Sequence, residues 1–150
     1  MARIDELLAE YSESHRNVTN KRIHYLCVPL IFWSIVGLLY LIPIPIGVDW
    51  MNAAFLALAL LTAYYIRLSV PLSIVMFLFA MACMFSWQWL AMHNYTIWKL
   101  ALLVFSLAWI GQFYGHKIEG KKPSFLKDIQ FLLIGPAWIA AQIFGIGMKK

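Results

Sequence analysis

The chain has 150 residues, of which 63% are hydrophobic and 16% aromatic, and its mean hydropathy is +0.74. These values lie far above those of a soluble domain and predict a membrane protein. The formal net charge of +5 does not require nucleic acid as a partner, because basic residues beside membrane spans act as an orientation signal and can also touch anionic lipid.

Long stretches of the chain carry no charge. No Asp, Glu, Lys or Arg occurs in Tyr25–Val48, Trp50–Ile66, Leu68–Trp98, Leu100–Gly115 or Ile129–Met148. Crossing about 30 Å of hydrocarbon takes roughly 20 apolar residues, and backbone groups in lipid must be satisfied internally. No alternating barrel pattern is present, so we predict an all-α fold. It would be a polytopic membrane helical bundle, a single integral-membrane domain over residues 1–150.

The predicted elements begin with a short N-terminal amphipathic helix over Met1–Ser14, which we expect to lie on the membrane surface. Its apolar face would carry Ile4, Leu7, Leu8 and Tyr11. Thr19 or Asn20 could cap the next helix. In all we expect four to five membrane helices, a polar loop at Gly115–Asp128 and a break in the last helix at Gly135–Pro136 that would let it re-enter. The expected spans are Lys21–Ile42, Trp50–Ile66, a segment from Pro71 to about Met92, Trp98–Tyr114 and Ile129–Met148.

Basic residues alternate from one side of the predicted spans to the other. Four precede the first span, none lies in Pro43–Asp49, one is Arg67, one is Lys99, and four lie in Lys117–Lys127. The positive-inside rule therefore places the N-terminus, Arg67 and the Lys117–Lys127 loop in the cytoplasm. We expect an integral protein of the bacterial inner membrane, or of the endoplasmic reticulum membrane in a eukaryote.

Three of the four histidines, His15, His24 and His116, fall on this cytoplasmic side. Imidazole binds iron, zinc and copper, and the other ring nitrogen is usually held by an amide, carboxylate or carbonyl. The pattern predicts a metal site with these three as catalytic ligands. Asn20, Gln112 and Glu119 lie at helical spacing from the histidines and are the candidates to hold the other ring nitrogen.

Simpler interpretations stand beside each of these. A single histidine at a membrane interface is more often an anchor than a ligand. Asn20 also fits a helix cap alone, and Glu119 fits a partner of a neighbouring lysine in solvent. His93, on the opposite side, fits a turn residue. Cys27 and Cys83 fit buried reduced thiols, and the tryptophans near span ends fit an interfacial belt. Phosphate loops, nucleophile elbows and HExxH are absent, and no carboxylate lies inside a predicted span.

Two blocks carry a resemblance to a known family: SHRNVTNKRIHYLCVP, and WIGQFYGHKIEGKKPSF followed by LIGPAW. They are similar to the signature blocks of the Mpo1-like family of small polytopic proteins, which includes the 2-hydroxy fatty acid dioxygenase of fungal phytosphingosine degradation. One difference is Val18, where the fungal type has a proline soon after its first asparagine. The matching residues here are His15, Asn17, Asn20, His24, Trp109, Gln112, Gly115, His116, Glu119 and Pro123.

The resemblance implies an Fe²⁺-dependent α-oxidation, in which a 2-hydroxy fatty acid loses its carboxyl carbon with O₂ as oxidant. Three ligands on one face of an octahedral iron leave positions for the carboxylate, the 2-hydroxyl and O₂. The acyl tail would lie between spans. Basic residues at the bundle mouth could attract the carboxylate, namely Arg16, Lys21, Arg22 and Lys117.

Two other functions stay open from the sequence: a haem-binding electron-transfer or sensory protein, and a metal-free lipid-binding membrane scaffold. The sequence gives neither the acyl chain length nor the oligomeric state. It also leaves open whether His93 or Glu119 is a ligand.

Overall fold

The structure, a computed structural model, describes residues 4–13, 15–46, 51–120 and 125–146, with side chains for all of these except residues 125–132. In this part of the chain there are six helices and no β-strand beyond an isolated bridge between Pro43 and Asn52. The predicted all-α class is therefore confirmed. The helices are α1 (Ile4–Glu13), α2 (Val18–Tyr40), α3 (Ala53–Leu68), α4 (Val70–Met92), α5 (Ile97–Glu119) and α6 (Phe125–Phe144).

Three helices, α2, α4 and α5, are long and apolar enough to cross a membrane. Each has 23 residues, or about 34 Å at a rise of 1.5 Å per residue, which matches the hydrocarbon thickness. The helix α3 and the Leu133–Phe144 part of α6 are shorter apolar helices. Three of the expected four to five membrane helices therefore have the required length. That α3 and α6 also cross the membrane stays a prediction.

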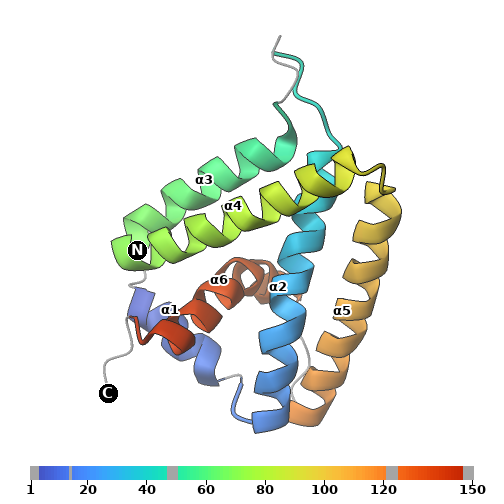
Figure 1. Cartoon of the computed structure of the whole chain (residues 1–150). Helices are drawn as coiled ribbons and strands as arrows, with labels where there is room; N and C mark the ends of the chain where they lie inside the picture. The colour runs from blue at the N-terminus through green and yellow to red at the C-terminus, as the bar shows by residue number, and fades with distance from the viewer. Residues whose placement is uncertain (1–3, 14, 47–50, 121–124, 147–150) are drawn as a thin grey trace.

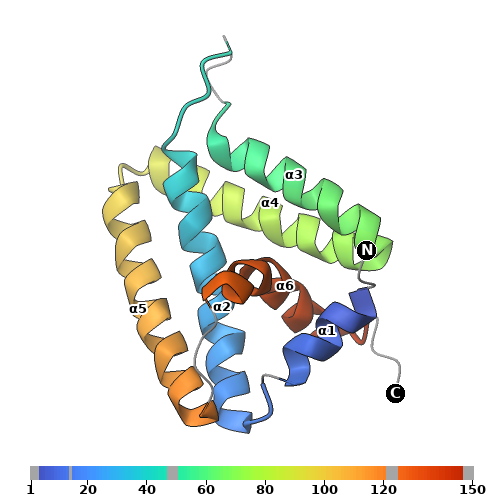
Figure 2. The ribbon, with the colours of Figure 1, turned by 180° about the vertical axis from the view of Figure 1, so that it is seen from behind.

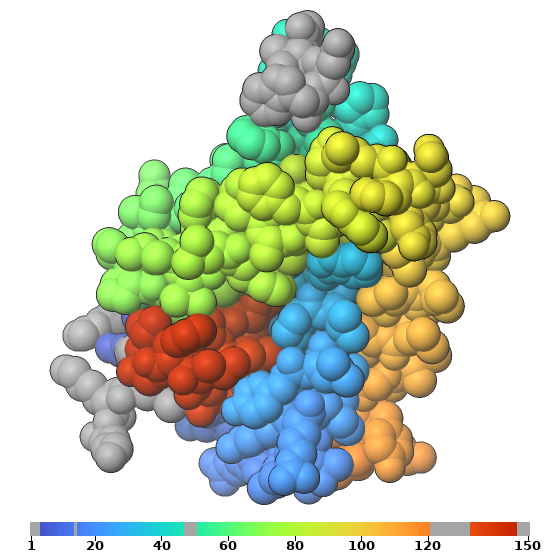
Figure 3. Space-filling view, viewed as in Figure 1, coloured from blue at the N-terminus to red at the C-terminus, as the bar shows by residue number. Residues whose placement is uncertain are grey.

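The helices are arranged around α2 (Figures 1 and 2). Helices α2 and α5 lie side by side and run in opposite directions, while α3 and α4 form a hairpin that crosses them near the C-terminal end of α2. Helices α1 and α6 pack beside the N-terminal half of α2. In the space-filling view, α6 fills the surface between α4 and this half of α2 (Figure 3).

Two glycines on α5 let it approach α2 closely. A Cβ on Gly111 would lie 2.6 Å from Sγ of Cys27, and one on Gly115 would overlap Oδ1 of Asn20. The spacing is the small-xxx-small pattern that membrane helices use for close packing. It brings the N-terminal turns of α2 against the C-terminal turns of α5, and therefore brings His24 towards His116.

The apolar face of α1 packs on other helices of the protein, and its expected place at the membrane surface stays a prediction. Leu7, Leu8 and Tyr11 are buried in one cluster with Ile134 and Trp138 of α6. This packing fixes the position of the end of α1, and therefore the point from which the chain continues to α2.

Several features of the helices differ from the predicted ones. Asn17, not Thr19 or Asn20, caps α2, because its side chain accepts from the backbone N–H groups of both later residues. The expected loop at Gly115–Asp128 is shorter, since α5 continues to Glu119 and ends at Gly120 with φ of 73°. The expected break at Gly135–Pro136 is wrong, because α6 is helical through both residues.

A cavity of about 420 Å³ lies between α2 and α3, further along α2 from the histidines. Its walls are almost entirely apolar and include Phe32, Ile35, Leu39, Ala57, Leu61 and Leu133. The first of these α2 residues is about 12 Å from His24 along the helix axis.

Candidate metal site

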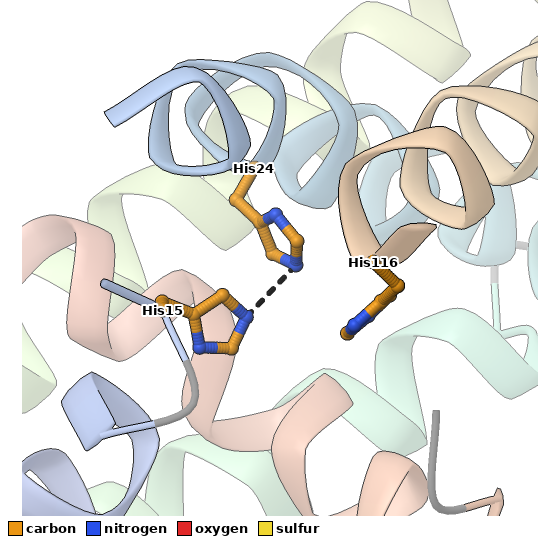
Figure 4. A group of neighbouring side chains, drawn as sticks. All are labelled: His15, His24 and His116. Carbon is orange, nitrogen blue, oxygen red and sulfur yellow. Dashed lines mark hydrogen bonds between the residues drawn. The ribbon is translucent and has the colours of Figure 1, made fainter. Parts of the chain in front are cut away.

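Three histidine rings from three different elements meet at one end of the α2–α5 pair (Figure 4). His15 lies in the loop between α1 and α2, His24 in the second turn of α2, and His116 in the last turn of α5. The ring centroids lie 4.3 Å apart for His15 and His24, 5.2 Å for His24 and His116, and 6.0 Å for His15 and His116. One ligand nitrogen from each ring lies within 4.8 Å of the other two.

The cluster is largely withdrawn from solvent. His15 and His24 are each 2% exposed, and His116 is half-buried. Histidines at this degree of burial need polar partners, because an unpaired buried polar group destabilises the fold.

Backbone carbonyls supply those partners and fix the tautomers of two rings. Nδ1 of His15 donates to the carbonyl of Tyr11 over 2.7 Å, and Nδ1 of His24 donates to the carbonyl of Asn20 over 2.9 Å. A carbonyl oxygen can only accept, so both Nδ1 atoms carry hydrogen, and in the neutral rings both Nε2 atoms carry a lone pair. This is the usual way in which a protein orients a metal-binding histidine.

The two Nε2 atoms face each other at 2.9 Å. Two lone pairs at this distance repel, and a cation that both can reach removes the repulsion. Two nitrogen ligands at right angles on a first-row metal lie about 3 Å apart, given bonds of about 2.1 Å. The donor set therefore fits a metal ion held by His15 and His24, with a ring nitrogen of His116 within 4.8 Å of both.

Two aromatic side chains, Tyr11 and Trp138, pack near the ring of His15. Tyr11 stacks on this ring with centroids 4.1 Å apart and planes 9° from parallel, and Trp138 lies 5.8 Å away. Trp138 is fully buried and donates its indole N–H to Oγ of Ser12 over 2.7 Å. Sequence reasoning gave Trp138 no site role and placed Tyr11 only on an apolar face. The four-residue spacing from Tyr11 to His15 was the available signal.

Glu119 lies beside the site, and its carboxylate bonds to the segment that begins α2. Its carboxylate accepts from the backbone N–H of Arg16 at 2.9 Å, from that of Asn17 at 3.0 Å and from Nδ2 of Asn20 at 2.9 Å. An acidic group at a helix N-terminus is favourable because of the helix dipole and the unpaired N–H groups there. Glu119 thus ties the end of α5 to the start of α2.

The roles of Asn20 and Gln112 as supports of the metal ligands stay predictions. Asn20 orients His24 through its backbone carbonyl, while its side chain bonds to Glu119. Gln112 is 4% exposed, and its Oε1 has no hydrogen-bond partner among the described residues.

Comparison with known families decides the relationship that the two sequence blocks suggested. A family model described as "Mpo1-like: 2-hydroxy-palmitic acid dioxygenase Mpo1-like" matches residues 1–146. The chain belongs to the Mpo1-like family. The match covers nearly the whole chain and confirms the resemblance. No curated protein matches the chain, and no solved structure does.

The structure explains several residues of the Mpo1-like pattern. Asn17 caps α2, and Gly115 allows the close contact with Asn20. Val18 replaces a proline of the fungal type at the first position of α2, where proline is well tolerated, so either residue suits this helix start. Pro123, Lys121 and Lys122 lie outside the described residues.

The basic residues expected to attract a carboxylate lie beside the histidines. Arg16, Arg22 and Lys117 are exposed and Lys21 is half-buried, and each is within three positions of a site histidine. Their role with substrate stays a prediction. His93 is exposed and stacks on Trp89. It lies beyond the N-terminal end of α5, and that end is about 28 Å from His116 along the helix axis.

Proposed function

We propose that this Mpo1-like protein is an Fe²⁺-dependent dioxygenase that shortens 2-hydroxy fatty acids by one carbon at the cytoplasmic face of a membrane. The observation that carries the proposal is the buried pair of facing Nε2 atoms on His15 and His24, with His116 beside it. The family description names a dioxygenase of 2-hydroxy-palmitic acid, and this cluster has the ligand type that such chemistry uses.

His15, His24 and His116 would hold the ion. Bound Fe²⁺ supplies a Lewis acid and a one-electron centre, which lets O₂ react with an organic substrate. Three protein ligands leave coordination positions for other molecules, as a catalytic site requires. A haem between His15 and His24 is less well supported, because axial nitrogens on opposite sides of one iron lie about 4 Å apart, whereas these two lie 2.9 Å apart.

The overall reaction balances without an external reductant. The 2-hydroxy acid and one O₂ give the acid that is one carbon shorter, one CO₂ and one water. The bond between the carboxyl carbon and the hydroxyl-bearing carbon breaks, and the latter becomes the new carboxyl carbon. The O₂ takes up the four electrons that the acid loses.

The chain's own residues would prepare this reaction by positioning. The carbonyls of Tyr11 and Asn20 hold two rings with Nε2 turned inward, and Glu119 holds the start of α2 against α5. The exposed charges of Arg16, Arg22 and Lys117 favour an anionic head group at this end of the bundle. The acyl tail would extend between the helices.

The test uses purified protein with Fe²⁺, O₂ and either 2-hydroxypalmitate or palmitate. We expect one-carbon shortening of the hydroxylated acid alone, with one O₂ consumed per product. His24→Ala should lose both bound iron and turnover, whereas His93→Ala should keep both. Equal conversion of the two acids, or full activity in a chelator, would refute the proposal.

A further inference from the structure

The side-chain oxygen Oε1 of the buried Gln112 has no hydrogen-bond partner among the described residues. Gln112 is 4% exposed, and its Oε1 is fully withdrawn from solvent. Gln112 precedes His116 by four residues on α5, so the two side chains share one helix face. A buried acceptor without a donor is unfavourable for the fold alone, and it therefore points to a molecule that binds there.

Other polar atoms near the histidines have a weaker claim to a bound molecule than Oε1 of Gln112. The Nδ1 atoms of His15 and His24 are satisfied by backbone carbonyls, so neither ring needs this amide. Oδ1 of Asn20 also lacks a partner, but it is pressed against Gly115 so closely that a Cβ there would overlap it. Nε1 of Trp109, the third such atom, lies almost one turn further from His116. Gln112 is thus the best-placed unpaired acceptor.

We propose that Gln112 is a substrate-binding residue whose amide oxygen accepts the hydrogen of the substrate's 2-hydroxyl group. The inference rests on the proposed function and deepens it. An amide oxygen can only accept, and an ionised carboxylate has no hydrogen to donate. The 2-hydroxyl is the group in the head of a 2-hydroxy acid that can satisfy Oε1. Gln112 would then help to distinguish hydroxylated from plain fatty acids.

The experiment measures binding without turnover, using iron-loaded protein under anaerobic conditions. The probes are 2-hydroxypalmitate, palmitate and 2-methoxypalmitate, the last of which keeps the oxygen but has no hydrogen to donate. Wild type should bind the hydroxy acid about tenfold more tightly than the methoxy acid, the usual effect of one hydrogen bond. Gln112→Leu should bring these two affinities within about twofold, a non-additive effect that marks direct contact.

Gln88→Leu is the matched control. Gln88 lies exposed on α4, where it accepts from the hydroxyl of Tyr40, and its loss should leave the wild-type preference intact. Iron content should be unchanged in Gln112→Leu, and its unfolding temperature without ligand should not fall, because an unpaired buried oxygen has been removed.

Two outcomes would overturn the inference and leave the proposed function standing. In one, Gln112→Leu keeps the wild-type preference for the hydroxy acid over the methoxy acid. In the other, it loses iron and binds all three probes equally less well, which would make Gln112 part of the metal support. If wild type neither prefers the hydroxy acid nor shortens it, the proposed function fails as well.

Discussion

Nδ2 of Asn20 donates a hydrogen bond to Oε2 of Glu119 across 2.9 Å, and these residues lie 99 positions apart in the chain. The same carboxylate accepts from the backbone N–H groups of Arg16 and Asn17. Asn20 in turn gives its backbone carbonyl to His24. One carboxylate on α5 therefore fixes the segment that carries both His15 and His24.

Replacing Glu119 should loosen that segment. Glu119→Gln puts an N–H group where the carboxylate accepted hydrogen bonds, so we expect about 1.5–3 kcal/mol less stability, the usual value for bonds to a charged group. Iron affinity should fall roughly 10–100-fold, as when a ligand's support is removed. Thermal unfolding and metal analysis measure the two effects. Glu10→Gln, on the exposed side of α1, is the control, and a Glu119→Gln protein with wild-type iron affinity would contradict the role assigned here.

Gly115→Ala should separate the two helices that carry His24 and His116. The added Cβ would overlap Oδ1 of Asn20, and overpacking of this kind typically reduces stability by about 1–3 kcal/mol. We expect weaker iron binding and lower turnover even in protein that remains folded. Ser106→Ala, on the exposed side of the same helix, should change neither quantity. Unaltered iron affinity in Gly115→Ala would show that the close approach of α2 and α5 is not needed for the site.

The orientation in the membrane can be tested by labelling single cysteines with an impermeant reagent. Arg22 and Lys117 lie at the histidine end of the α2–α5 pair, and Tyr95 lies beyond the other end of α5. Cysteines at Arg22 and Lys117 should react only from the cytoplasmic side, and a cysteine at Tyr95 only from the opposite side. The native Cys27 and Cys83 are buried, which keeps the background low. Labelling of Arg22→Cys and Tyr95→Cys from the same side would disprove the topology.

The apolar cavity between α2 and α3 offers a test of where the acyl tail lies. Ala57 lines the cavity, whereas Ala59 on the same helix is exposed and does not. Ala57→Phe should lower kcat/KM for long acids relative to short ones by at least about tenfold, since a pocket that loses this much space rejects extra methylenes. Ala59→Phe should keep the wild-type chain-length profile. If both variants behave alike, the tail lies elsewhere.

Apolar runs in the sequence predicted the helices well, because long uncharged segments have few alternatives in lipid. The placement of His15, His24 and His116 at one end followed from the alternation of Lys and Arg. The partners of Glu119 could not be predicted, since contacts across about a hundred residues depend on how α5 docks on α2. The position of Trp138 beside His15 could not be predicted for the same reason. It depends on the packing of α6 against α1 and on the continuity of α6 through Pro136.

The separation of the three histidines in the chain also sets the order of events during synthesis. His15 and His24 leave the ribosome early and near each other, whereas His116 is at the end of the fifth helix. A growing chain that has completed only α4 holds two of the three nitrogens and lacks Glu119, which fixes the segment around them. On the proposed function, the complete three-histidine site therefore forms only after α5 has been made and has docked on α2.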